Sequence, residues 1–575
     1  MISLSKLFSI FSKRQKINFF CLIFLSIINI FFEIISISLL VPLLSTLTED
    51  KSFLNNFFEN INFEFLNEMN FQDIIILLLL IYFIKFIFSL FFAYYKNNFY
   101  FLFQMDLMNK LFNEYIKRNY LFHVKSNSAK IIKDFLEEIH HVSIGFMGSV
   151  ISVIIEVLLI SSLIVFLLIF QTQYSIYVLV ITSLISFFVF FVLKKKISNL
   201  GQNREKFNLL NLMNINQALG GIKEIKIFQK EDEIINNFEV NSNNLKNTNW
   251  LISFYNETPK IFFELISLSS FLIILYIFVG LGYSFVQIIS YFVIIFAIFI
   301  RIMPSINKLI VSYVNLTINH RALEIVYNEL ITNKNSTENI LPSTKTKLNF
   351  EKEIRINNLS FKYDKNSDYI FKNINLEIYK GEILGIIGQT GSGKSTFLDL
   401  IIGLLKPSEG NILVDGKNIR ENSVEWFKKI GYVPQNMYLN DDSIKKNIAF
   451  TYHDNKIDND RILEVAEKSK INQMIKNKKD KLETRVGERG NMLSGGQKQR
   501  LSLARALYQN YAEVLIFDEF TSALDMGTEN EIMNEIINFQ KEKTIIMSTH
   551  RQNLLKYCDK IFNIETNEII LNEKK

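Results

Sequence analysis

The chain has 575 residues, of which 49% are hydrophobic and 14% aromatic, and its formal net charge is +6. A chain this long and this apolar is not a single compact domain of ordinary composition, so we expect at least two domains. The net charge is small for the length and the cations do not gather in one basic stretch, which argues against a nucleic-acid partner.

Several apolar runs in the first half are long enough to cross a membrane, since a bilayer core needs about 20 apolar residues per helix. The runs are residues 18–47, 74–94, 144–170, 174–193, 261–280 and 284–303. The sequence therefore predicts an all-α, six-span transmembrane domain over residues 1–332. The first run is too long for a signal peptide and lacks a small-residue cleavage site, so we expect a retained helix.

Basic residues at the ends of these runs indicate orientation, because translocation disfavours Lys and Arg in short flanking segments. They precede the first run at 13–16 and follow the fourth at 194–196. This predicts a multi-pass protein of the bacterial cytoplasmic (inner) membrane with both termini in the cytoplasm. The connections 96–142 and 195–258 keep apolar residues at helical spacing, which predicts cytoplasmic helical extensions. The outer segment 53–71 either lies amphipathically on the membrane face or is an exposed loop.

Residues 333–346 are polar, and after them the pattern changes to short apolar strands and amphipathic helices. We expect a linker there and an α/β nucleotide-binding domain over residues 347–575. The apolar strand 383–387 leads into Gly388-Gln389-Thr390-Gly391-Ser392-Gly393-Lys394-Ser395. A helical pattern follows from Thr396, so this is a complete phosphate-binding loop in its required context. Its glycines let backbone amides converge on phosphates, Lys394 adds a positive charge and Ser395 offers Mg²⁺ a hydroxyl.

A second apolar run, 514–517, is typical of a buried parallel strand and ends in Asp518 and Glu519. Carboxylates at the carboxyl end of such a strand are expected beside the phosphate loop. Asp518 is predicted to hold Mg²⁺ through water. Glu519 is predicted to orient or deprotonate the water that attacks ATP.

Residues 493–497, Leu-Ser-Gly-Gly-Gln, resemble the signature of the ATP-binding-cassette (ABC) family. The resemblance implies that Tyr363 stacks on adenine, that Gln435 links Mg²⁺ to the membrane domain, and that His550 contacts the γ-phosphate. It also implies a dimer-contact loop at 522–525. Pattern and resemblance together predict Glu519, His550 and Gln435 as catalytic and Ser395, Gln435 and Asp518 as metal-binding. The predicted nucleotide-binding residues are Tyr363, Gly388, Gln389, Thr390, Gly391, Ser392, Gly393, Lys394, Ser395, Thr396, Ser494, Gly495, Gly496 and Gln497.

In the ABC family each ATP lies between the phosphate loop of one subunit and the signature of the other, so the resemblance implies a dimer. Gln435, Glu519 and His550 are all present, which favours a homodimer with two competent sites. The resemblance further implies ATP and Mg²⁺ as cofactors and an ATP hydrolase coupled to transport. Residues 217–224 resemble the coupling helix of an exporter.

Cations within the spans offer the clue to cargo, because charge in a bilayer is costly and usually faces a cavity. Lys85, Lys260 and Arg301 are therefore candidate substrate-cavity residues that would attract an anionic head group. Alternatively, the acids Glu33, Glu156 and Glu264 neutralise them in structural ion pairs, with Lys260 extending to the interface.

The segments 301–305, 258–260 and 430–436 resemble bacterial flippases of lipid-linked oligosaccharides. This resemblance predicts flipping of a lipid-linked saccharide or related amphiphile by alternating access. Positions 85 and 260 are lysine where those flippases would have arginine. Lysine cannot donate the two parallel hydrogen bonds with which an arginine guanidinium binds phosphate. The alternative is a general multidrug, lipid or peptide exporter. Two further alternatives are a soluble ATPase of DNA repair or translation, which the spans argue against, and an ATP-gated channel or regulator.

Overall fold

The computed structural model describes residues 2–40, 42–43, 71–169, 199–280, 285–332, 348–364, 366–509, 512–521, 526–538 and 543–571. The chain forms two compact units. Unit 1 comprises Met1–Lys117 and Ser126–Thr337, and unit 2 comprises Arg118–Lys125 and Glu338–Lys575. The predicted fourth span, the linker and all but the last residue of the outer segment lie outside the described residues.

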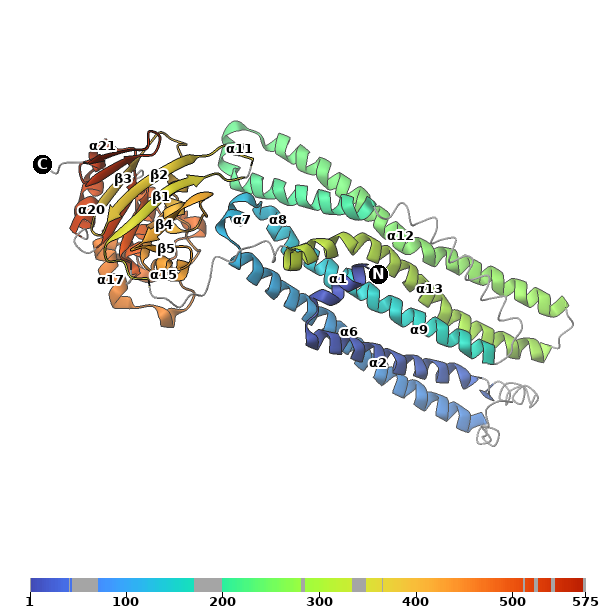
Figure 1. The fold of residues 1–575 in the computed structure, drawn as a ribbon. Helices are drawn as coiled ribbons and strands as arrows, with labels where there is room; N and C mark the ends of the chain where they lie inside the picture. The colour runs from blue at the N-terminus through green and yellow to red at the C-terminus, as the bar shows by residue number, and fades with distance from the viewer. Residues whose placement is uncertain are drawn as a thin grey trace. The chain divides into compact units, whose positions relative to one another are not determined.

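Unit 1 consists of helices joined by short turns over its described residues, and its longest helices lie side by side (Figure 1). Residues 199–220 are helical. The other helices are α1 (Ile2–Ile10), α2 (Lys13–Ser38), α6 (Phe71–Lys117), α8 (Ser128–Lys133), α9 (Met147–Ile169), α11 (Ile222–Phe228), α12 (Glu231–Gly280) and α13 (Phe285–Tyr327), with the π-helices η1 (Asp134–Glu138), η2 (His141–Phe146) and η3 (Asn328–Thr332).

The apolar surface of unit 1 is suited to lipid. Within the described ranges, three helical stretches are long and apolar enough to cross a membrane: Lys13–Ser38, Phe71–Lys117 and Ser128–Phe166. Only 11% of the most apolar window of α6 is buried, and Leu79 and Phe83 are exposed on it. Exposed apolar area on this scale would be unfavourable in water, so these helices require a bilayer around them.

The helices also continue well past the predicted spans. α6 runs to Lys117, and α13 runs without a break through Pro304 to Tyr327. α2, α9 and α13 enclose a buried core that includes Ile30, Leu163 and Ile302. The predicted helical extensions at 96–142 and 195–258 are mainly helical over their described residues, with short breaks at 118–119, 126–127, 221 and 229–230.

Unit 2 contains two sheets, as expected for an α/β domain. An antiparallel sheet has the order β2-β1-β4-β5, and a mainly parallel sheet has the order β10-β9-β3-β8-β7-β6. The strands are β1 (Glu353–Phe361), β2 (Phe371–Tyr379), β3 (Ile383–Ile387), β4 (Glu409–Val414), β5 (Lys417–Asn418), β6 (Ile430–Val433), β7 (Val514–Asp518), β8 (Thr544–Ser548), β9 (Lys560–Asn563) and β10 (Glu568–Leu571).

Helices cover these sheets and form the walls of two apolar cores in unit 2. They are α14 (Lys394–Ile402), α15 (Ser423–Lys428), α16 (Ile444–Ala449), α17 (Asn459–Lys468), α18 (Asn472–Lys476), α19 (Gly495–Tyr508), α20 (Met526–Asn538) and α21 (Gln552–Leu555). β7 and β8 are buried along their whole length, which explains their continuous apolar sequences.

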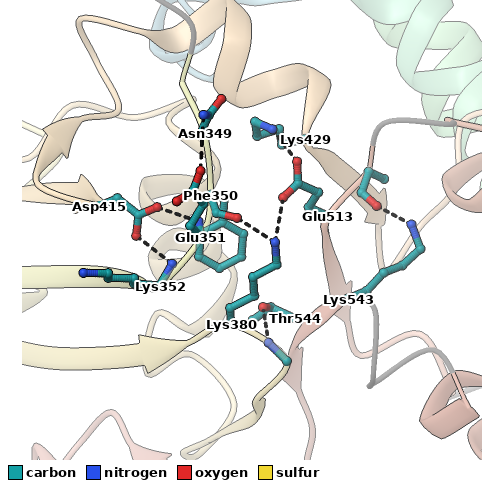
Figure 2. Close-up of polar contacts among 12 residues, drawn as sticks. Asn349, Phe350, Glu351, Lys352, Lys380, Asp415, Lys429, Glu513, Lys543 and Thr544 are labelled. Atoms are coloured by element: carbon teal, nitrogen blue, oxygen red, sulfur yellow. Dashed lines mark hydrogen bonds and ion pairs between the residues drawn. The ribbon is translucent and has the colours of Figure 1, made fainter.

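The start of β1 is fixed by the turn between β4 and β5. Asp415 and Gly416 form a two-residue hairpin loop with φ of +46° and +81°, the geometry that Asp-Gly favours. The Asp415 carboxylate accepts hydrogen bonds from the backbone amides of Glu351 and Lys352 at 2.5 and 3.0 Å (Figure 2). It also accepts one from the amide of Glu353 at 2.9 Å. Partial burial alone would raise the pKa of Asp415, but these amides lower it below its ordinary value.

A second set of contacts in Figure 2 joins the two sheets at the same end of unit 2. Lys380 donates to the Phe350 carbonyl at 2.8 Å and lies 3.5 Å from Glu513, which also pairs with Lys429. The chain segment that precedes β1 is thus tied both to the β4–β5 turn and to the start of β7.

Replacing Asp415 with Ala should lower the unfolding free energy of unit 2 by about 1–3 kcal/mol, because it leaves backbone amides without their charged acceptor. Asp415→Asn should cost less. The wild-type advantage over Asp415→Asn should hold above the ordinary aspartate pKa and disappear as the pH falls through the lowered one. Buried Trp426 in unit 2 can report unfolding by fluorescence in a Trp250→Phe background. Exposed Asp441→Ala is the control, and an equal loss there would contradict the assignment.

Candidate nucleotide-binding site

The strand order of the parallel sheet brings the predicted site residues to one edge. β3, β8, β7 and β6 are consecutive neighbours and all parallel, so their carboxyl ends lie in a row. The phosphate loop follows β3, His550 follows β8, Glu519 follows β7 and Gln435 follows β6. Residues distant in sequence are therefore close in space because of strand pairing.

The phosphate loop has the tight backbone that its glycines permit. Gly393 caps α14 with a φ of +93°, and a Cβ there would lie 2.7 Å from Ile370 and Phe371 side-chain atoms. Only glycine fits both this conformation and this space. The Ser392 hydroxyl is buried in the loop without a hydrogen-bond partner among the described residues. An unpaired polar atom at this position fits a phosphate oxygen as its partner.

Lys394 is buried and lies among the other charged groups of the site. Its ammonium donates to the carbonyls of Gly388 and Gln389, each at 3.0 Å. It lies 2.7 Å from His550 Nε2 and 3.7 Å from Glu519 Oε1. The predicted phosphate-binding lysine, γ-phosphate contact and general base therefore form one cluster.

Glu519 is held in position by its neighbours on β8 and by Gln435. Its backbone has a φ of +45°, which is uncommon for a residue other than glycine and often marks a functional position. Its amide donates to the hydroxyl and carbonyl of Ser548 at 3.1 and 3.3 Å. Its carboxylate lies 2.9 Å from His550 Nε2 and accepts a hydrogen bond from Gln435 Nε2 at 2.8 Å.

Asp518 is buried at the end of β7 and accepts a hydrogen bond from the Ser548 hydroxyl at 2.7 Å. Burial, followed by the charge of Asp518, raises the pKa of nearby Asp399 to about 6. Ser395 lies exposed in the first turn of α14. The described ranges contain no group of three or more His, Cys, Asp or Glu residues that could hold a metal ion.

Tyr363 reaches the phosphate-loop helix, because its hydroxyl lies 2.9 Å from the Thr396 hydroxyl. Sequence reasoning predicted helix over 96–142 but not that one part of it, α7 (Tyr120–Lys125), belongs to unit 2 and contacts Tyr363. Lys125 donates to the Tyr363 carbonyl at 3.0 Å and pairs with Asp364, and Leu121 packs against the core of unit 2. Residues 217–224, which resemble the coupling helix of an exporter, contain a turn at Gly221 that separates the preceding helix from α11.

The signature lies at the start of α19. The Ser494 hydroxyl accepts a hydrogen bond from the Gln497 amide, and the Gln497 side chain accepts one from the Ser494 amide, which together form a capping box. Ser494 and Gly495 are exposed and Gly496 is half-buried, so the helix N-terminus is accessible. Such a terminus favours an anion. The predicted dimer-contact loop at 522–525 lies outside the described residues.

The candidate cavity cations are partly neutralised in the structure. Lys85 and Arg301 both pair with buried Glu33, at 3.0 and 2.6 Å. Lys260 is exposed. Lys85 and Arg301 therefore form structural ion pairs, as the alternative prediction stated. Because the two cations share one carboxylate, the group keeps one positive charge in excess.

Comparisons with known proteins identify both parts of the chain. Residues 19–304 match the ABC transporter transmembrane region, and residues 371–522 match the ABC transporter family. A solved bacterial Atm1-family ABC exporter with ATP bound matches with a TM-score of 0.76 at 19% identity, over 96% of this chain and 93% of that one. This match shows the fold.

Curated relatives include a leukotoxin export ATP-binding protein of Aggregatibacter actinomycetemcomitans, 38% identical over 219 residues. A leukotoxin translocation ATP-binding protein of Mannheimia glucosida is 37% identical over 219 residues. These alignments cover 38% of this chain but only 31% and 30% of the relatives. An ATPase domain of this family implies ATP hydrolysis coupled to transport, as the sequence predicted. The chain therefore belongs to the ABC transporters: it combines an ABC transmembrane region with an ABC ATPase domain and has the fold of an ABC exporter.

Proposed function

We propose that the chain is an ATP-driven exporter of the bacterial cytoplasmic membrane that works as a homodimer, with ATP and Mg²⁺ bound between subunits. The observation that carries this proposal is that unit 2 contains two elements. One is the assembled cluster at the phosphate loop, and the other is an exposed signature at the start of α19. Lys394, Glu519 and His550 lie within 4 Å of one another, whereas Ser494 presents a free helix end. Two copies would supply each nucleotide with both elements.

The proposed chemistry assigns a role to each residue of the cluster. Loop amides and Lys394 would bind the polyphosphate and stabilise charge on the leaving oxygens. Glu519 would orient the attacking water or accept its proton, with His550 contacting the γ-phosphate. Bound Mg²⁺, held by Ser395, Gln435 and Asp518, would neutralise phosphate charge. This assignment is supported by the position of the Glu519 carboxylate, which lies 3.7 Å from Lys394 Nζ and 2.9 Å from His550 Nε2.

The comparisons favour a general exporter, whose cargo would be a drug, a lipid or a peptide. The curated relatives are named for leukotoxin export, so a polypeptide should be tested as cargo alongside lipids and drugs. Glycolipid flipping remains the second candidate. The observation in its favour is the excess positive charge of the Lys85–Glu33–Arg301 group, which would attract a pyrophosphate head group.

The test is cargo-dependent activity in proteoliposomes. Purified protein should show ATP-dependent movement of one cargo class and ATPase activity that rises with that cargo, from a panel of a drug, a labelled phospholipid, a peptide and a pyrophosphate-linked glycolipid. Active ATPase without transport of any of them would contradict the exporter proposal and favour a channel or regulator.

The same vesicles separate the two candidates. If the glycolipid is the cargo, Lys85→Ala and Arg301→Ala should each reduce its flipping by about tenfold while basal ATPase survives, because each removes a head-group charge. Each single variant leaves Glu33 with one partner, so folding should hold. Lys308→Ala is the control, since Lys308 pairs with Glu156 elsewhere in unit 1. Undiminished flipping in both variants would remove the glycolipid candidate.

A further inference from the structure

A polar pocket of about 310 Å³ lies within unit 1, apart from the Lys85–Glu33–Arg301 group. It is formed by η2 with the start of α9, by the helix that contains Arg204, and by the second half of α13. The residues on which the argument rests are His140, His141, Gly145, Arg204, Ser312 and Asn319. Its volume falls at the lower end of the range for small-molecule sites.

The backbone around the pocket is specialised. η2 is π-helical, a local form that is rare and often found at functional sites. Gly145 lies in it, and a Cβ at that position would be 2.5 Å from Asn319 Nδ2. The absence of that Cβ lets Asn319 reach Arg204, whose Nη2 donates to Asn319 Oδ1 at 3.0 Å. Asn319 is itself fixed, because its Nδ2 donates to the Asn315 carbonyl at 2.8 Å.

The charge of the pocket is positive. No acidic residue lines it, and Arg204 forms no ion pair with any residue in the described part of the chain. Glu137 and Glu138 act on Arg204 electrostatically but form no ion pair with it: Glu137 accepts a hydrogen bond from Asn208 at 2.8 Å, and Glu138 pairs with Lys133 at 3.0 Å. Arg204 therefore presents a guanidinium that a neutral amide orients and with which no carboxylate of the described residues is in contact.

We propose that this pocket binds an oxyanion, a phosphate or carboxylate group, through the guanidinium of Arg204. A guanidinium offers several donors in a planar fork that matches both groups. The Ser312 hydroxyl and the imidazoles of His140 and His141 line the same space and add donors. The oxyanion comes either from a soluble compound or from the head group of an anionic lipid. The site stands on its own geometry and does not depend on which cargo the exporter carries.

Binding of inorganic phosphate to the full chain in detergent tests the soluble source. A saturating non-hydrolysable ATP analogue keeps phosphate out of the nucleotide loop, and the shift in unfolding temperature reports binding. Arg204→Gln should weaken phosphate binding by about tenfold or more, because it removes the charged donor. Arg204→Lys should bind phosphate with an affinity between those of the wild type and Arg204→Gln, since it keeps the charge but loses the planar fork of donors. Arg321→Gln is the control, because that arginine is exposed and pairs with Glu205 outside the pocket.

The lipid source is tested in nanodiscs. Phosphatidylglycerol should raise the unfolding temperature of the wild type above that in phosphatidylcholine, and Arg204→Gln should lose this increment while Arg321→Gln keeps it. A response in either arm that depends on Arg204 supports the site and identifies its source. If neither phosphate nor phosphatidylglycerol distinguishes Arg204→Gln from Arg321→Gln, or the wild type responds to neither, the proposal is overturned. ATP hydrolysis enters neither readout, so these outcomes are separate from those that test export.

Discussion

Glu519→Gln should lower the ATP hydrolysis rate of the reconstituted protein by about 10²- to 10⁴-fold, the range typical of losing a general base. Glutamine has the same shape and can keep the contacts with His550 and Gln435, so the site should stay assembled. ATP binding should survive or tighten, because the variant removes a negative charge that lies 3.7 Å from Lys394. The variant should therefore accumulate bound ATP.

Phosphate release gives the rate, and retention of labelled ATP after rapid desalting gives the occupancy. Glu513→Gln is a matched control at the opposite end of the same strand, where Glu513 pairs with Lys380 and Lys429. Its hydrolysis rate should remain near that of the wild type. Substantial hydrolysis by Glu519→Gln would refute the assigned role, and loss of ATP binding would indicate a structural role.

The nucleotide site was largely predictable from sequence because its chemistry constrains local residue order. A loop that wraps phosphate needs glycines at fixed spacing, which made residues 388–395 recognisable. The side-by-side arrangement of His550, Glu519 and Gln435 at the ends of adjacent strands was not predictable in the same way. It depends on the pairing order β3-β8-β7-β6, and pairing between distant strands leaves no local pattern.

The features that sequence analysis missed lack a periodic signal. α7 lies within the stretch 96–142 that was predicted to be helical, but its six residues are too few for an apolar stripe to indicate what it packs on. The pocket around Arg204 depends on a π-helix and on the contact of Gly145 with Asn319, neither of which follows a 3.6-residue period. The partners of Lys85 and Arg301 were left open because helix packing decides which charges meet, and both meet Glu33.

Mixing two inactive variants should restore ATPase activity if nucleotide is bound between subunits. Lys394→Ala removes the phosphate-loop cation. Ser494→Asp keeps a good cap for α19 but places a negative charge where the partner's γ-phosphate would lie. Each homodimer has two damaged sites and should be nearly inactive. A mixed dimer has one site with both changes and one with neither.

Random assembly from equal amounts makes half of the dimers mixed, so about a quarter of all sites should be intact. ATPase activity should therefore rise from background to about a quarter of the wild-type rate when the variants are co-expressed. Ser494→Asn separates the effect of the charge from that of the cap, because asparagine caps equally well without charge and should be less impaired alone than Ser494→Asp. If each chain built its site from its own signature, every site in the mixture would carry one of the two changes. Activity that stays at background in verified mixed dimers would therefore contradict the shared site.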